Sequence, residues 1–288
     1  MIGGMAQGAA QLVQRAIGDR YRLEPAPPDF PTAPLPWRLF PATELSSGRT
    51  VAVKAIPDEN LPPEIRLRFE REVGAVESAP GWLGQPHLAS PRILPVLSRS
   101  GRDGIVYYVT PWLPEGSLRA RMQREPTMPV ADALTILDDT AAAVGFLHER
   151  GFVHARLKPE NILFEGGRAV LADGFSRVVG LVVQLPPSLE ILDYDSPELM
   201  RGERVGSARG DVYSLAVIAF EMLAGRRPFL GTPMEAAYKK VTGTAPPVSS
   251  PRPEVSPALS DALAKALSPN PEDRFADANE LRRAIAGP

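Results

Sequence analysis

The sequence has no cysteine and only three histidines, His87, His148 and His154. These absences exclude disulfide scaffolds and thiol nucleophiles, and they argue against zinc sites built from histidine and cysteine. Any metal ion that this chain binds is therefore expected to have oxygen ligands.

An excess of positive charge and a long hydrophobic run are also missing. The 32 basic and 34 acidic side chains leave a formal net charge of −2 at pH 7, so no net field attracts a nucleic-acid backbone. Outside the amino terminus, the longest uncharged apolar run is residues 178–189, which is shorter than the ~20 residues of a membrane-spanning helix. Glutamines interrupt the apolar part of residues 1–17 and argue against a signal peptide. We therefore expect a cytoplasmic protein that binds no nucleic acid and spans no membrane.

The sequence does have length and an excess of proline. Its 288 residues are enough for two lobes at about 150 residues per domain. Seven of the 32 prolines lie in residues 24–41. This cluster disfavours a regular central strand and predicts a sheet edge or an irregular segment.

The hydrophobic pattern changes along the chain from mainly alternating to helical. Residues 5–17 predict an amphipathic helix that packs on the body of the protein or on a partner. Strands are predicted at 49–56, 93–97 and 104–109, and a charged helix at 64–77. Helices are predicted at 131–149 and 211–223, with two more between 256 and 286. A small β-rich part followed by a larger helical part indicates an α+β chain.

Five short motifs follow one another along the chain. They read VAVK at 51–54, HARLKPENIL at 154–163, LADGFSR at 171–177, SPE at 196–198 and DVYSLAVIAFEMLAGRRPF at 211–229. In this order and at this spacing they resemble the signatures of bacterial eukaryotic-like (Hanks-type) Ser/Thr protein kinases. The resemblance implies a two-lobed protein-kinase-like fold, with residues 1–19 as an N-terminal helical extension, 20–113 as a small β-rich N-lobe and 114–288 as a larger helical C-lobe.

The resemblance also implies a nucleotide site. Lys54 matches the lysine that anchors the phosphates, and Glu72 matches its carboxylate partner, but we favour a structural ion pair between strand and helix over a working phosphate anchor. Lys158 matches the catalytic-loop lysine. Asn161 and Asp173 match the oxygen ligands that hold magnesium.

Further positions match the family's adenine-binding and structural residues. Pro111 and Leu113 match the backbone groups that contact a purine. By the same resemblance, Asp211 holds the backbone of the catalytic loop, and Glu198 and Arg274 form an ion pair in the large lobe.

The catalytic loop departs from the family pattern. The family's His-Arg-Asp triplet reads His154-Ala155-Arg156, so a guanidinium stands where the family has the aspartate that accepts the hydroxyl proton. Arginine stays cationic and cannot act as that base. We expect Arg156 to form a salt bridge with Asp173 that blocks magnesium, and His154 to be a buried structural side chain rather than a catalyst.

Other parts of the nucleotide site depart as well. The phosphate-binding loop falls on residues 32–37, TAPLPW, which contain no glycine and two prolines that lack an N–H. The magnesium motif reads Asp173-Gly174-Phe175, and a second register would put Ala172 in the metal-ligand position. Ile191 stands where the family has a threonine that binds substrate.

These departures predict a pseudokinase with no catalytic residue and no required cofactor, acting as a scaffold or allosteric regulator. Its partner would be a protein, either an active kinase or the substrate of one. Trp82 and Leu83, in the insertion at 81–90, are the candidate partner surface, with residues 25–41 and 178–189 as alternatives. The alternative functions are an atypical magnesium-dependent phosphoryl or nucleotidyl transferase, and an ATP-binding sensor with weak Ser/Thr kinase activity.

Overall fold

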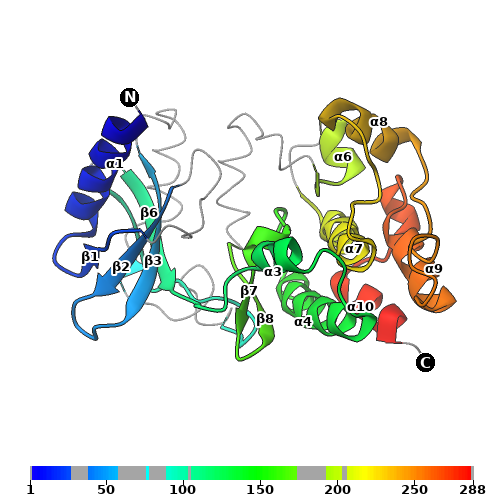
Figure 1. Cartoon of the computed structure of the whole chain (residues 1–288), viewed down its shortest axis with the longest axis horizontal. Coiled ribbons are helices and arrows are strands. Elements are labelled where there is room, and N and C mark those ends of the chain that lie inside the picture. Colours follow the sequence, from blue (N-terminus) through cyan, green and yellow to red (C-terminus); the bar gives the residue numbers. More distant parts are fainter. Residues whose placement is uncertain are drawn as a thin grey trace. The chain divides into compact units, whose positions relative to one another are not determined.

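The computed structural model of the chain describes residues 2–26, 38–57, 76–77, 89–102, 105–173, 193–202 and 206–286 (Figure 1). It divides into two compact units, which are Met1–Ser90 with Leu94–Trp112 and Pro91–Ile93 with Leu113–Pro288. The first unit is built on an antiparallel sheet, and the second is mainly helical. The chain is therefore α+β, as the sequence predicts.

The sheet of the first unit has six strands in the order β1-β2-β3-β6-β5-β4. The strands are β1 (Tyr21–Leu23), β2 (Arg38–Glu44), β3 (Thr50–Pro57), β4 (Val76–Glu77), β5 (Ser98–Arg102) and β6 (Ile105–Pro111). β3 and β6 are the strands predicted at 49–56 and 104–109. They pair over seven residues, from Val51 with Pro111 to Pro57 with Ile105.

Helix α1 (Ile2–Ile17) packs on one face of this sheet. Val13 and Ile17 are buried there together with Tyr21, Ala42, Val51, Val53, Ala55, Ile105, Tyr107 and Val109. Gln14 links the helix to β1, since its side chain donates to the Tyr21 carbonyl at 3.0 Å and accepts from the Leu23 N–H at 2.7 Å. The predicted amphipathic helix thus packs on the first unit itself. Because side chains alternate along β3, Lys54 lies on the opposite face.

The proline-rich segment ends earlier than the sequence predicts. Pro41 lies inside β2, which is flanked by β1 and β3 and is not an edge strand. The Pro41 carbonyl accepts from the Glu24 N–H at 2.9 Å, on the β1 side and just past the last β1 pair, Leu23 with Ala42. N–H and C=O of one strand residue point the same way. A backbone N–H at position 41 would therefore point to the β1 side, where β1 has already ended. The proline removes no hydrogen bond between β2 and β3.

Two other local predictions are wrong. The strand predicted at 93–97 does not form, because Pro95 offers no N–H and Ile93 makes an isolated parallel bridge to Leu171 instead. β5 begins at Ser98, just after the residues predicted as a strand. Val76, predicted on a charged helix, lies in β4 and pairs with Arg99. The remainder of that predicted helix, residues 64–75, lies outside the described residues.

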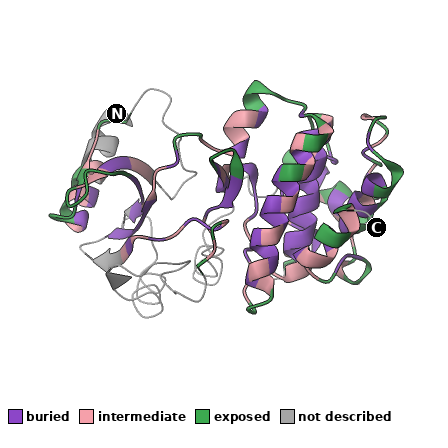
Figure 2. Cartoon of the chain, turned by 90° about the horizontal axis from the view of Figure 1, so that it is seen from below, coloured by how far each residue is buried: buried purple, intermediate pink, exposed green. Residues whose placement is uncertain are grey.

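The second unit surrounds a buried helix. Its helices are α3 (Leu118–Arg124), α4 (Val130–His148), α6 (Pro197–Met200), α7 (Ala208–Ala224), α8 (Pro233–Thr242), α9 (Pro257–Ala266) and α10 (Ala278–Ala286), with short 3₁₀ helices η4 (Pro159–Asn161) and η5 (Pro271–Asp273) and a hairpin of β7 (Ile162–Glu165) and β8 (Arg168–Leu171). α7 is buried along nearly its whole length and packs against α4, α9 and α10 (Figure 2). None of the described helices is long and apolar enough to cross a membrane.

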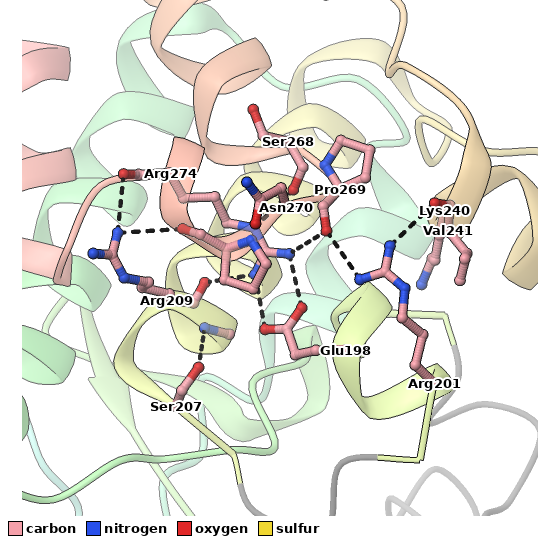
Figure 3. A network of polar contacts seen from close by, with 12 residues as sticks. Glu198, Arg201, Ser207, Arg209, Lys240, Val241, Ser268, Pro269, Asn270 and Arg274 are labelled. Carbon is pink, nitrogen blue, oxygen red and sulfur yellow. Dashed lines mark hydrogen bonds and ion pairs between the residues drawn. The ribbon is translucent and has the colours of Figure 1, made fainter.

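A buried ion pair joins α6 to the segment before α10 (Figure 3). Arg274 donates from Nη1 and Nη2 to the two carboxylate oxygens of Glu198 at 2.9 and 2.8 Å. The remaining N–H groups of Arg274 reach the carbonyls of Ser268, Arg209 and Pro269. Burial raises the pKa of Glu198, but the hydrogen bonds and charge of Arg274 outweigh it and hold that pKa below its ordinary value. The pair is thus buried with its polar groups satisfied.

Candidate functional site

The segment that matches the catalytic loop, residues 154–161, is held by the carboxylate of Asp211 in the first turn of α7. One oxygen accepts from the His154 N–H and the other from the Ala155 N–H, both at 2.7 Å. His148 Nε2 lies 2.9 Å from the first oxygen. Since Asp211 is 1% exposed, these bonds form away from water, where a charged acceptor holds backbone N–H groups firmly.

The loop turns through a strained residue at Ala155. Its φ is +58°, a left-handed conformation that costs a non-glycine residue about 1–2 kcal/mol. Gly206 lies against it, because a Cβ at position 206 would stand 2.3 Å from the Cβ of Ala155. The Asp211 carboxylate and the missing side chain at 206 together allow the loop to keep this turn.

His154 is buried, and both its ring nitrogens contact backbone. The Arg156 N–H donates to Nδ1 at 3.3 Å, so Nε2 carries the proton and donates to the Ala172 carbonyl at 2.9 Å. Burial lowers the pKa of His154. These contacts support a structural role, in which a neutral imidazole ties the catalytic loop to the end of β8.

The low pKa of His154 predicts a pH-dependent stability. The unfolded chain takes up a proton below about pH 6.5 and the folded chain does not, so the free energy of unfolding should fall as the pH drops through that value, by at most ~1.4 kcal/mol per pH unit. Urea denaturation at pH 7.5 and 5.0 measures this fall. A His154→Gln variant should show a smaller fall, whatever its absolute stability. An equal fall in the variant would assign the effect to other groups.

The salt bridge predicted between Arg156 and Asp173 does not form. Among the described residues no ion pair joins these two side chains, and Asp173 interacts with another group. Asp173 has a φ of +60°, a conformation that aspartate tolerates better than most residues. Instead, the positive charge of Arg156 acts on the carboxyl of Asp195, whose pKa it lowers.

The sequence analysis missed Asp195, a carboxyl group on which the positive charges of three basic side chains act. Burial raises the pKa of its carboxyl to about 7, against the opposing charges of Lys240, Arg156 and Lys158. Lys240 is 3% exposed, and its Nζ donates to the carbonyls of Asp193 and Asp195 at 2.6 and 3.2 Å. Burial lowers the pKa of Lys240 to about 7. An acidic residue directly before the SPE motif was the signal available in the sequence.

Asn161 and Asp173 lie together at one end of the β7–β8 hairpin. The Ala172 N–H donates to the Asn161 carbonyl at 2.8 Å, which places Asp173 next to that pair. Asn161 is buried, and its Nδ2 donates to the Arg156 carbonyl at 3.0 Å, while no hydrogen bond to its Oδ1 is found among the described residues. A carboxylate and an amide oxygen are ligands that suit magnesium, which commonly takes the rest from phosphates and water. These two residues therefore fit the metal that the resemblance implies.

A second network, also absent from the sequence analysis, fixes the turn after Lys158. Arg119 of α3 donates from Nε to Glu160 at 2.8 Å and also contacts the Tyr194 hydroxyl. That hydroxyl donates to Glu221 of α7 at 2.5 Å. Burial raises the pKa of Tyr194, so it stays protonated. The network joins η4 and the segment before α6 to two helices of the second unit.

Of the remaining described site residues, Lys54 and Pro111 lie in the first unit and Leu113 lies in the second. Lys54 pairs with Tyr108 across β3 and β6, and its Nζ lies 5.9 Å from the centre of the Tyr108 ring. Pro111 ends β6 opposite Val51, while Leu113 begins the main part of the second unit.

Several predicted features lie outside the described residues. They are Glu72, Trp82 and Leu83, Gly174 and Phe175, Ile191, the loop at 32–37 and the apolar run at 178–189.

One exposed apolar face stands out on the second unit. Met234 and Tyr238, which are four residues apart on α8 and so share one helix face, are 79% and 69% exposed, and Leu230 in the segment before the helix is 49% exposed. Exposed apolar groups of this kind mark surfaces that bind other proteins more often than isolated ones do.

Comparison with known proteins agrees with this geometry. A family model described as protein kinase domain matches residues 38–284. Serine/threonine-protein kinase PknB of Mycobacterium leprae is 31% identical over 252 residues, which cover 84% of this chain and 39% of that protein. A probable serine/threonine-protein kinase of Streptomyces coelicolor is 29% identical over 281 residues, or 93% of this chain and 40% of that protein. The chain thus spans about two fifths of the length of these relatives.

Proposed function

Since this chain belongs to the protein kinase domain family, together with bacterial Hanks-type Ser/Thr kinases, we propose that it is a pseudokinase that regulates a partner protein by binding it. The observation that carries this proposal is the guanidinium of Arg156 in a catalytic loop that otherwise keeps its supports. Asp211 and His154 hold the loop backbone, yet the loop presents a cation where a proton acceptor is needed.

Loss of the base has a large expected effect on transfer. General-base help contributes about 10²- to 10⁴-fold to such reactions, and the family's phosphate loop has lost its glycines here. Phosphoryl transfer depends mainly on positioning and charge neutralisation. A chain that lacks both the catalytic base and the glycines of the phosphate loop therefore keeps the kinase fold but loses the catalytic rate. The partner would be an active kinase or the substrate of one. The exposed face of α8 joins Trp82 and Leu83 as a candidate partner surface.

A second candidate function is magnesium-dependent phosphoryl or nucleotidyl transfer, or ATP sensing with weak Ser/Thr kinase activity. The observation that favours it is the pair of oxygen donors at Asn161 and Asp173 at one end of the β7–β8 hairpin. In this alternative, the Asp195 carboxyl, whose pKa of about 7 suits a general base, is the group to test for proton acceptance.

A phosphotransfer assay decides between the two functions. The wild-type chain is incubated with radiolabelled ATP and magnesium, with itself and a generic basic protein as acceptors, beside the catalytic domain of an active relative. We expect the wild-type chain to transfer no more label than Asp173→Asn or Asp195→Asn variants, and at least about 10²-fold less than the relative.

The two variants also show what measurable transfer by the wild-type chain would mean. Transfer by the wild-type chain that Asp173→Asn abolishes would contradict the pseudokinase proposal and establish a metal-dependent transferase. If Asp195→Asn also removed that activity while leaving ATP binding intact, Asp195 would be the proton acceptor.

A further inference from the structure

The only sulfur atoms of the chain are methionine thioethers, since it has seven methionines and no cysteine. Oxidants attack a thioether according to its access to solvent. Three of the described methionine side chains, Met122, Met128 and Met222, lie in the core and are at most 6% exposed. Met200 is half-buried, whereas Met234 on α8 is 79% exposed. Met234 therefore carries the most accessible thioether among the described side chains.

The packing of α8 turns Met234 away from the rest of the second unit. The helix contacts α6 (Figure 1) and buries Ala236 and Lys240. With 3.6 residues per turn, a residue two positions away lies about 200° around the helix axis. Met234 precedes Ala236 by two positions, and Tyr238 follows it by two. Both exposed side chains thus lie on the side opposite the buried one.

The cap at the start of α8 holds the turn that carries Met234. The Thr232 hydroxyl accepts from the Glu235 N–H at 3.3 Å, and the Glu235 carboxylate accepts from the Thr232 N–H at 2.8 Å. Pro233 follows at the first helical position, where its fixed φ suits the helix. A reciprocal cap of this kind satisfies N–H groups that a helix end otherwise leaves unpaired. The thioether is therefore presented by a formed helical turn.

We propose that Met234 is a peroxide-reactive site whose oxidation to the sulfoxide changes the exposed face of α8 from apolar to polar. A lone pair of the sulfur forms a bond to one oxygen of hydrogen peroxide, and the O–O bond breaks. The departing hydroxide takes the proton of the transferred oxygen and leaves as water. The sulfur loses two electrons and the peroxide gains them. Methionine sulfoxide reductases reverse this change.

Oxidation at this position should leave the fold intact. The thioether of Met234 lies in solvent, so the sulfoxide oxygen is hydrated and needs no partner inside the protein. Oxidation of Met128 or Met222 would instead place a polar oxygen in the core. The site is independent of the pseudokinase proposal, since it requires neither phosphoryl transfer nor a bound partner.

Peptide mass mapping after limited oxidation tests the reactivity of the site. The full chain is treated with hydrogen peroxide, the reaction is stopped with catalase, and the oxygen gained by each methionine-containing peptide is followed with time. We expect Met234 to gain one oxygen at least about tenfold faster than Met122, Met128 and Met222, which react only when the core opens. Treatment with methionine sulfoxide reductase should remove that oxygen.

Hydrophobic-interaction chromatography tests the change of surface character. Retention of the folded chain on a phenyl column measures its exposed apolar surface. Limited oxidation should lower the retention of the wild type and of Met200→Leu, the matched control for a half-buried thioether. It should lower the retention of Met234→Leu much less. The melting temperature of the oxidised wild type should stay unchanged.

The proposal is overturned if Met234 is oxidised no faster than the three buried methionines. It is also overturned if oxidation lowers the retention of Met234→Leu as much as that of the wild type, or if it raises the retention of the wild type, which would indicate unfolding. None of these results would bear on the phosphotransfer assay.

Discussion

Replacing Glu198 with glutamine is expected to lower the free energy of unfolding by about 3–5 kcal/mol. Glutamine has nearly the same shape, but it leaves the guanidinium of Arg274 buried without a counter-charge. The Arg274 side chain is fully buried and that of Glu198 is 4% exposed. Water therefore cannot replace the lost carboxylate. Urea denaturation of the wild type and the variant measures the difference.

The chain offers a matched control for this prediction. Arg282 and Asp138 form a similar two-bond pair, at 2.5 and 3.1 Å, but their side chains are 44% and 40% exposed. Asp138→Asn should cost no more than about 1 kcal/mol, because water solvates both charges. Equal losses in the two variants would show that burial does not set the strength of the Glu198–Arg274 pair. A double variant, Glu198→Leu with Arg274→Met, should lose less stability than the sum of the single changes.

Replacing Asp211 with asparagine should cost about 2–4 kcal/mol and loosen the catalytic loop. An asparagine side chain has one acceptor oxygen, so it can satisfy the N–H of His154 or of Ala155, and its NH₂ group would face the other. One buried N–H then lacks a partner, and the charge that strengthens both bonds is lost. The positive φ of Ala155 also loses its support. Hydrogen exchange at the two amides should accelerate by at least about 10-fold beyond the change in global stability.

A serine on the same helix provides the control. Ser214 donates to the Tyr194 carbonyl at 2.8 Å, and Ser214→Ala should cost about 1 kcal/mol without exposing the amides of His154 and Ala155. If Asp211→Asn left the exchange of those amides unchanged relative to Ser214→Ala, Asp211 would not be what holds the loop.

The elements that the sequence predicts well are those whose local pattern and burial agree. Residues 211–223 are apolar on nearly every side, which only a central helix accommodates, and α7 is that helix. Residues 49–56 alternate because one face of β3 packs under α1. The local sequence pattern predicts the wrong structure where a contact with a distant segment decides the conformation. Pro41 is tolerated inside β2 only because β1 ends beside it. The sequence around Pro41 does not show where β1 ends.

In the candidate site, too, the sequence predicts some features well and others wrongly. Motif spacing places Asp211, Glu198 and Arg274 at positions where the structure forms their contacts, and it identifies Arg156 as a cation in the catalytic loop. It does not say which carboxyl group feels the charge of that cation. The sequence predicts an ion pair with Asp173, which is not found among the described residues, whereas the charge of Arg156 lowers the pKa of Asp195, 39 positions away along the chain.

The sequence by itself determined the fold class, the order of the main elements and the chemical character of the catalytic loop, because each depends on residue type and on spacing of a few positions. Only the tertiary structure decided which charges are paired and which are not. The network around Tyr194 and the charges that act on Asp195 both depend on where distant segments meet. Electrostatic energy changes steeply with distance and burial, so these properties exist only once the chain has folded.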